Sequence, residues 1–150
     1  MSYIAAVLLL EMDDYQALCC LSTLLNGKVV QEFIMMNTPA IDQYWECFSE
    51  LFHEFIPDLA KHFSSICLTC DLFLLDWFMT LFAKSLPLEQ VGRIWDVMIT
   101  ESESFLLRAS LGILLTLKDS LINVNIGPCK KMLGRIPTEA SIPLRTLTYQ

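Results

Sequence analysis

The sequence predicts an all-α domain, and three observations lead to that prediction. Apolar residues recur at spacings of three and four along most of the chain, which is the period of an amphipathic helix. Prolines stand where helices should begin, and glycine or polar residues stand where they should end. No stretch alternates apolar and polar residues as a strand does. A chain of 150 residues is expected to form one domain, here a lobe of about eight to nine helices.

The first half of the chain is expected to form four helices, over residues 2–10, 13–25, 29–35 and 38–55. Asp13, with Gln16 three residues later, has the pattern of a capping box that opens the second helix. Thr38 is the predicted N-cap of the fourth helix, because Pro39 follows it at the first helical position.

The helix predicted over 38–55 has two distinct faces. Its apolar side chains repeat at three and four and form one stripe: Ile41, Tyr44, Trp45, Phe48, Leu51, Phe52 and Phe55. Its acidic side chains repeat at four and form a ridge beside that stripe: Asp42, Glu46, Glu50 and Glu54. The stripe should therefore pack on the rest of the protein while the ridge faces solvent.

The second half is expected to form five more helices, over residues 57–64, 70–82, 87–99, 105–121 and 128–133. Thr69 is the predicted cap of the central helix that starts at Cys70. The helix over 105–121 is apolar on nearly all sides, which predicts a central position. The helical signal weakens near the C-terminus, so we expect a domain over 1–140 and a weakly ordered tail over 141–150.

The net charge of −7 is unevenly spread. Residues 1–117 hold 5 basic and 15 acidic side chains, so the body is acidic and nucleic acid is not an expected partner. Residues 118–150 hold 5 basic and 2 acidic side chains. This segment leaves peripheral association with an anionic membrane open, although five charges over about 28 residues do not make the cluster that membranes attract.

Hydrophobic residues make up 54% of the chain and the mean hydropathy is +0.48, which leaves few charges to cover a core. We therefore expect a lobe that packs against more protein. The most apolar run, 72–82, is far shorter than the ~20 residues of a spanning helix, so no transmembrane segment is expected. The first residues lack the features of a signal peptide, which predicts a cytoplasmic protein.

Six cysteines show no disulfide framework, and reduced thiols are expected. Cys67 and Cys70 form a CxxC, but a metal site needs a second pair of ligands and the chain has neither a second CxxC nor a His-x-His. His53 is expected at the surface, and His62 has no nucleophile near it in the sequence. The chain also lacks a Gly-x-Ser-x-Gly elbow and a phosphate-binding glycine loop. No metal, cofactor or bound nucleotide is predicted.

Asp76 lies among apolar neighbours in its predicted helix, where a carboxylate needs a partner. A pair from Arg93 to either Asp76 or Asp96 would satisfy the charges and fix the two helices as a hairpin. Trp77 and Trp95 are expected in the core rather than as surface anchors for a partner, because their helices are mostly apolar.

Three motifs occur in order in this region: Asp76-Trp77, Ser85-Leu86-Pro87 and Arg93-Ile94-Trp95-Asp96. Together they resemble the C-terminal half of the TBC domain, an all-helical domain that activates Rab-type small GTPases. The resemblance covers residues 1–140 and implies a TBC-type C-terminal lobe. It assigns six residues to the scaffold of that lobe: Asp76, Trp77, Pro87, Arg93, Trp95 and Asp96.

The start of the chain resembles the segment that directly follows the Tyr-x-Gln-Gly motif of this family. That motif holds the catalytic glutamine, and the catalytic arginine lies upstream in an Ile-x-x-Asp-x-x-Arg motif. Neither motif occurs in these 150 residues. The resemblance implies a GTP-bound Rab-type GTPase as partner, a role in vesicle traffic, and partner contacts at Met1, Ser2 and Tyr3.

Two functions are compatible with these observations. The chain is either part of a GTPase-activating domain, inactive without a missing N-terminal lobe, or a non-catalytic helical module that binds a GTPase or another protein. In neither case is it expected to be an enzyme by itself, since the GTPase holds the nucleotide and its magnesium ion.

Overall fold

The computed structural model describes residues 2–138, and these residues form nine α-helices and no strand. The helices are α1 (Ser2–Glu11), α2 (Asp14–Leu25), α3 (Lys28–Ile34), α4 (Thr38–Phe55), α5 (Pro57–Ser65), α6 (Asp71–Met79), α7 (Leu88–Thr100), α8 (Phe105–Leu121) and α9 (Ile126–Gly134). The predicted all-α fold is confirmed. Met1 and the tail predicted over 141–150 lie outside the described residues.

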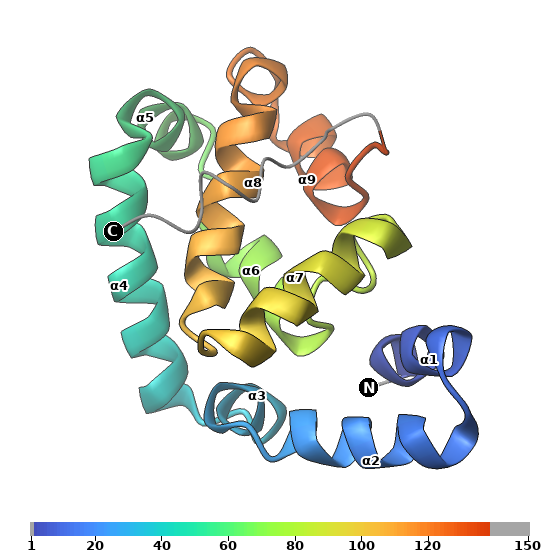
Figure 1. Ribbon diagram of the computed structural model, residues 1–150. Coiled ribbons are helices and arrows are strands. Elements are labelled where there is room, and N and C mark those ends of the chain that lie inside the picture. Colours follow the sequence, from blue (N-terminus) through green and yellow to red (C-terminus); the bar gives the residue numbers. More distant parts are fainter. Residues whose placement is uncertain (1, 139–150) are drawn as a thin grey trace.

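The helices fall into an inner group and an outer arm (Figure 1). α6, α7, α8 and α9 lie together, and α2, α3 and α4 follow one another along the outside of this group. α8 is the central helix, as predicted, because 9 of its 17 residues are buried. Within the described part of the chain, no helix is long and apolar enough to cross a bilayer.

α4 shows the two faces that its sequence predicts. Ile41, Phe48 and Phe52 are buried, while the whole acidic ridge is exposed. Trp45 packs against Phe33 of α3, with ring centroids 5.3 Å apart. The prediction is wrong for Phe55, which is 64% exposed because the helix ends there.

The helix caps differ from the predictions at two places. Asp13 caps α2 as expected, because its carboxylate accepts hydrogen bonds from the backbone N–H groups of Tyr15 and Gln16. Thr38 and Thr69 are not caps, however: the residues before α4 and α6 are Asn37 and Cys70, and neither makes a side-chain capping bond.

A backbone N–H group at the N-terminus of α3 has its hydrogen-bond acceptor in a distant part of the sequence. Glu103, in the loop between α7 and α8, accepts a hydrogen bond of 2.9 Å from the backbone N–H of Val29. A Cβ atom on Gly27 would meet this carboxylate at 1.8 Å, so the close approach requires glycine at that position.

α6 ends three residues earlier than predicted, at Met79 rather than Phe82. Leu81 and Phe82 adopt left-handed backbone angles, with φ of 47° and 64°, and both side chains are fully buried. The indole of Trp95 donates a hydrogen bond of 2.9 Å to the Leu81 carbonyl. This contact ties the turn after α6 to α7.

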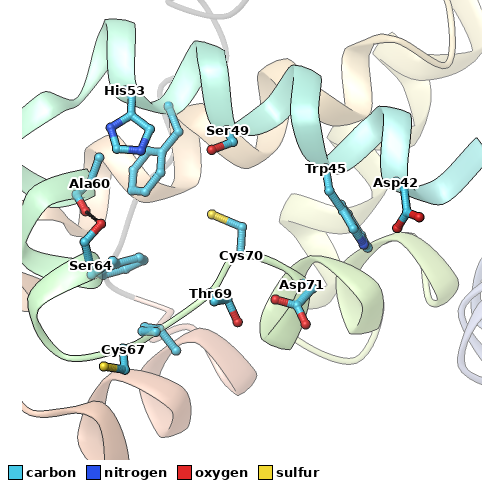
Figure 2. Close-up of a pocket in the computed structure, with 13 residues that line it drawn as sticks. Asp42, Trp45, Ser49, His53, Ala60, Ser64, Cys67, Thr69, Cys70 and Asp71 are labelled. Atoms are coloured by element: carbon cyan, nitrogen blue, oxygen red, sulfur yellow. Dashed lines mark hydrogen bonds between the residues drawn. The ribbon is translucent and has the colours of Figure 1, made fainter.

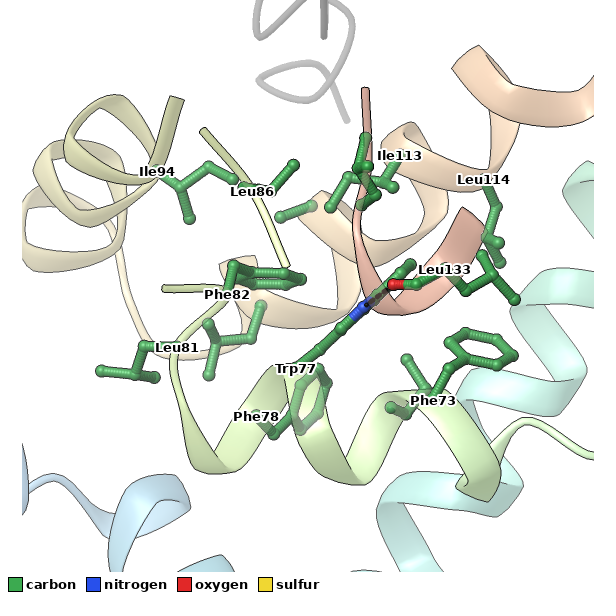
Figure 3. Close-up of a cluster of buried hydrophobic side chains, with 14 of the residues drawn as sticks. Phe73, Trp77, Phe78, Leu81, Phe82, Leu86, Ile94, Ile113, Leu114 and Leu133 are labelled. Carbon is green, nitrogen blue, oxygen red and sulfur yellow. Dashed lines mark hydrogen bonds between the residues drawn. The ribbon is translucent and has the colours of Figure 1, made fainter. Parts of the chain in front are cut away.

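Trp77 lies at the centre of the core (Figure 3). Its side chain is fully buried among residues such as Phe73 and Phe82, and its indole N–H donates a 3.0 Å hydrogen bond to the carbonyl of Leu133. The predicted burial of Trp77 and Trp95 is therefore confirmed, and each indole also bonds to the backbone of another element.

Candidate functional site

The first turn of α1 is the part of the chain for which partner contacts are predicted. Ser2 and Tyr3 are exposed in this turn, and Tyr3 is 48% exposed. Ile4 is fully buried, so it anchors the helix while the tyrosine remains at the surface. Met1 falls outside the described residues.

Asp76 lies at the surface and not in the core, contrary to the prediction. Its side chain is 53% exposed and forms an ion pair of 2.6 Å with Lys84. The reason is its position on α6: Trp77 points into the core, and Asp76 is one residue away on the solvent side. Leu72, four residues earlier on the same side, is also exposed.

Lys84, in the loop after α6, is the partner of Asp76. The hydrogen bond donated to Asp76 and the negative charge of that carboxylate raise the pKa of the Lys84 ammonium, and Tyr3 acts in the same direction. The Lys84 side chain therefore stays protonated at neutral pH. Lys84 belongs to none of the sequence motifs, although it is the single basic residue in the stretch 72–92.

Arg93 does not form either of the predicted pairs. It bonds to Glu89, one turn earlier on α7, at 2.8 Å, and both side chains are mostly exposed. The buried side of α7 carries Ile94 and Trp95, so Arg93 and Asp96 project into solvent. The turn after α6 is joined to α7 by the buried indole of Trp95, and neither predicted ion pair contributes. Pro87 precedes α7 as its N-cap residue, in agreement with the predicted helix start.

A groove of about 710 Å³ separates the α1–α2 hairpin from α7. Its apolar lining includes Leu8, Leu24 and Trp95, and Glu11 and Asp96 add negative charge. Large apolar side chains are exposed on the same two helices, including Leu10 at 71% and Leu18 at 65%.

A second hollow, of about 730 Å³, lies between α4, α5 and the loop that leads to α6 (Figure 2). Cys70 lies beneath α4 there, whereas Cys67 lies at the far end of the loop. Burial raises the pKa of the Cys70 thiol to about 12, so it is not a thiolate at neutral pH. Among residues 2–138, no three potential metal ligands lie together. Cys70 is therefore not an activated nucleophile in this hollow.

Comparison with known proteins agrees with this architecture. The sequence model of the Rab-GTPase-TBC domain matches residues 1–122, which is most of the chain. This chain belongs to the Rab-GTPase-TBC domain family. The resemblance carried by the motifs between residues 76 and 96 is thereby confirmed.

Curated relatives of this TBC chain come from animals and an amoeba. TBC1 domain family member 14 of Rattus norvegicus is 39% identical over 139 residues, covering 93% of this chain and 20% of that protein. TBC1 domain family member 12 of Xenopus tropicalis is 37% identical, with the same coverage. Drainin of Dictyostelium discoideum is 32% identical over 91% of this chain and 31% of its own length. The chain thus spans about a fifth of the first two relatives.

The motif residues of this TBC chain occupy two kinds of position. Trp77 and Trp95 form the buried scaffold, whereas Asp76, Arg93 and Asp96 lie at the surface. The histidines lie elsewhere: His53 is exposed on α4, and a ring nitrogen of His62 lies 3.0 Å from the Val124 carbonyl. Among the predicted site residues, Asp76 pairs with Lys84, and Tyr3 is exposed in the first turn of α1.

Proposed function

We propose that this chain is the scaffold and docking half of a GTPase-activating domain that acts on GTP-bound Rab-type small GTPases in vesicle traffic. The observation that carries the proposal is the family match over residues 1–122, together with relatives that are TBC1 domain family members. We place its action in the cytoplasm, at the surface of the endomembranes that carry the GTPase.

The reactive side chains are not among these 150 residues. A GTPase-activating arginine supplied in trans is worth roughly a thousand- to a hundred-thousand-fold in rate, because it stabilises negative charge in the transition state. The sequence contains neither the arginine motif nor the glutamine motif of the family. We propose that an N-terminal lobe of the same domain supplies both, and that the present chain is inactive alone.

The surface of α1 and α2 is where we place that lobe. α1 is apolar on all sides, yet only Ile4, Val7 and Leu8 are buried. A helix that is apolar all round is normally covered by protein. Leu10 of α1 and Leu18 of α2 remain largely exposed, and they would be covered by the other lobe.

A single-turnover assay of GTP hydrolysis tests the proposal. We expect no acceleration of any Rab-type GTPase by the chain alone, and acceleration once a TBC N-terminal lobe carrying both motifs is added or fused upstream. Clear acceleration by the chain alone would show that it holds its own catalytic groups. Binding of a GTPase without acceleration, even in the presence of that lobe, would favour the alternative function as a non-catalytic binding module.

A further inference from the structure

The loop between α7 and α8, residues 101–104, is fixed in place by both of its carboxylates. Glu101 forms an ion pair with Arg108 in the first turn of α8. Glu103 accepts the hydrogen bond of 2.9 Å from the backbone N–H of Val29, at the start of α3. Because a Cβ atom on Gly27 would lie 1.8 Å from this carboxylate, the position of Glu103 leaves little room for adjustment. The loop therefore connects the end of α7 with α3.

Thr100 is the last residue of α7 and lies directly before these carboxylates. It is exposed, as are its neighbours over 99–102. Its hydroxyl donates a hydrogen bond of 2.9 Å to the carbonyl of Asp96, one turn earlier, and Asp96 is itself exposed. Three acidic residues thus accompany this hydroxyl in the sequence: Asp96 four residues before it, Glu101 directly after it and Glu103 three residues after it.

Negative charge already accumulates where the loop meets α3. The pKa of Tyr44 on α4 is raised, first by burial and then by the negative charges of Glu103 and Glu32. Glu32 belongs to α3. A further anionic group near Glu103 would therefore be repelled, and the repulsion would act on the hydrogen bond between Glu103 and Val29.

We propose that Thr100 is a phosphorylation site whose modification weakens the attachment of α3 to the α7–α8 loop. The enzyme class is an acidophilic protein kinase, because kinases select substrates partly by complementary charge and acidic residues follow this hydroxyl. The inference is independent of the activity proposed above, since it concerns contacts within the chain.

The phosphoryl donor is ATP. The Oγ1 atom of Thr100 forms a bond with the γ-phosphorus, and the bond between that phosphorus and the β–γ bridging oxygen breaks, so that ADP leaves. The hydroxyl proton passes to the catalytic aspartate of the kinase. The product is a phosphothreonine at the end of α7.

The modification adds about 1.5–2 negative charges at neutral pH. These charges lie at the C-terminus of α7, where the helix dipole disfavours an anion. They also lie beside Glu101 and one turn after Asp96, and like charges at the latter spacing destabilise a helix. The last turn of α7 therefore loosens and the loop moves. Glu103 cannot follow this movement and keep its place beside Gly27, so the backbone N–H of Val29 loses its acceptor.

The first experiment tests whether Thr100 accepts phosphate. The chain is incubated with ATP and casein kinase II, a kinase that recognises acidic residues after the acceptor hydroxyl, and the modified residues are mapped by mass spectrometry. We expect phosphate on Thr100 and its loss in Thr100→Val. Ser104→Ala is the matched control, because it removes another exposed hydroxyl of the same segment and should leave the modification of Thr100 unchanged. Absence of phosphate from Thr100 would overturn the proposal.

The second experiment tests the effect on α3 by amide hydrogen exchange. We expect the Val29 amide to exchange about tenfold faster in the phosphorylated chain, because its acceptor is lost, while the amides of α9 exchange at an unchanged rate. Unchanged exchange at Val29 would overturn the link to α3. Slower exchange would mean that Arg108 captures the phosphate and orders the loop, and it would overturn the link as well.

Two variants test the same link without a kinase. Thr100→Glu adds one negative charge and should accelerate exchange of the Val29 amide by a smaller factor than phosphorylation does. Thr100→Gln is its uncharged control and should leave the rate unchanged. Equal rates for the two variants would show that charge at this position does not act on α3, which would contradict the proposal.

Discussion

At the scale of single residues, Asp76 and Trp77 are sequence neighbours with opposite environments. Trp77 is fully buried and hydrogen-bonded to Leu133, whereas Asp76 is more than half exposed and paired with Lys84. The sequence predicts the burial of Trp77 correctly, because a large aromatic residue in an apolar helix belongs in the core. The predicted burial of Asp76 is wrong, because residues that are neighbours in the sequence of a helix do not all lie on the same side of it. One turn earlier, Leu72 is exposed on the same side of the helix.

Substitutions of Trp77 and Arg93 compare how much core packing and a surface ion pair contribute to the free energy of unfolding. We expect Trp77→Ala to lower the free energy of unfolding by about 3–5 kcal/mol, because it leaves a cavity and an unpaired Leu133 carbonyl. Arg93→Ala should cost no more than about 0.5 kcal/mol, because its pair with Glu89 is exposed. Denaturant titration measures both. A loss for Arg93→Ala as large as that for Trp77→Ala would show that the exposed pair matters as much as the buried indole.

At the scale of elements, helix positions are predictable from the sequence, and some helix ends are not. The predicted bounds of α8 are correct, because its apolar run begins and ends at polar turns. The end of α6 is not predicted, because Leu81 and Phe82 adopt left-handed angles that the sequence usually signals with glycine. Their burial, and the bond from Trp95 to the Leu81 carbonyl, hold them in this conformation. Contacts between residues far apart in the sequence produce no recognisable pattern in the residues around the helix end.

Two glycine substitutions test how backbone strain compares with side-chain packing. Met36, just past the end of α3, also has a positive φ, of 53°, but its side chain is 56% exposed. Met36→Gly relieves the strain and removes little packing, so we expect a gain of about 0.5–1 kcal/mol in unfolding free energy. Leu81→Gly relieves the same kind of strain but empties a buried site, so we expect a loss of about 2–4 kcal/mol.

Thermal unfolding of the two variants measures the comparison. Tm should rise for Met36→Gly and fall for Leu81→Gly. A rise for both would show that backbone strain outweighs burial in this turn, and the explanation given for the end of α6 would then fail.

At the scale of the whole molecule, the sequence motifs predict the buried helices but not which distant segments lie side by side at the surface. The sequence identifies the tryptophans of the α6–α7 hairpin and the exposed start of α1. It does not show that Ser85 and Ile136, far apart in the chain, are hydrogen-bonded. That contact brings α9 beside the α6–α7 loop. Lys130 of α9 and Asp76 of α6, which are far apart in the sequence, line one small hollow there.

The exposed apolar surface of the α1–α2 hairpin should govern the solution behaviour of the chain. We expect the isolated chain to self-associate through this surface, because large apolar patches are rarely left uncovered. Leu10→Glu with Leu18→Glu should give a monomer and change the unfolding free energy by no more than about 0.5 kcal/mol, since both side chains are mostly exposed. Sedimentation velocity measures the association. Equal association of the variant and the unaltered chain would place the contact elsewhere.

The bond from Val29 to Glu103 spans 74 residues, and this distance has a consequence for biosynthesis. While the ribosome is still translating the middle of the chain, the backbone N–H of Val29 cannot yet have its carboxylate acceptor. It gains this acceptor only after the loop that follows α7 has left the exit tunnel. A nascent polypeptide released before that point would contain α1, α2 and α3 without the hydrogen bond to Glu103. Proteases and chaperones could then bind these helices.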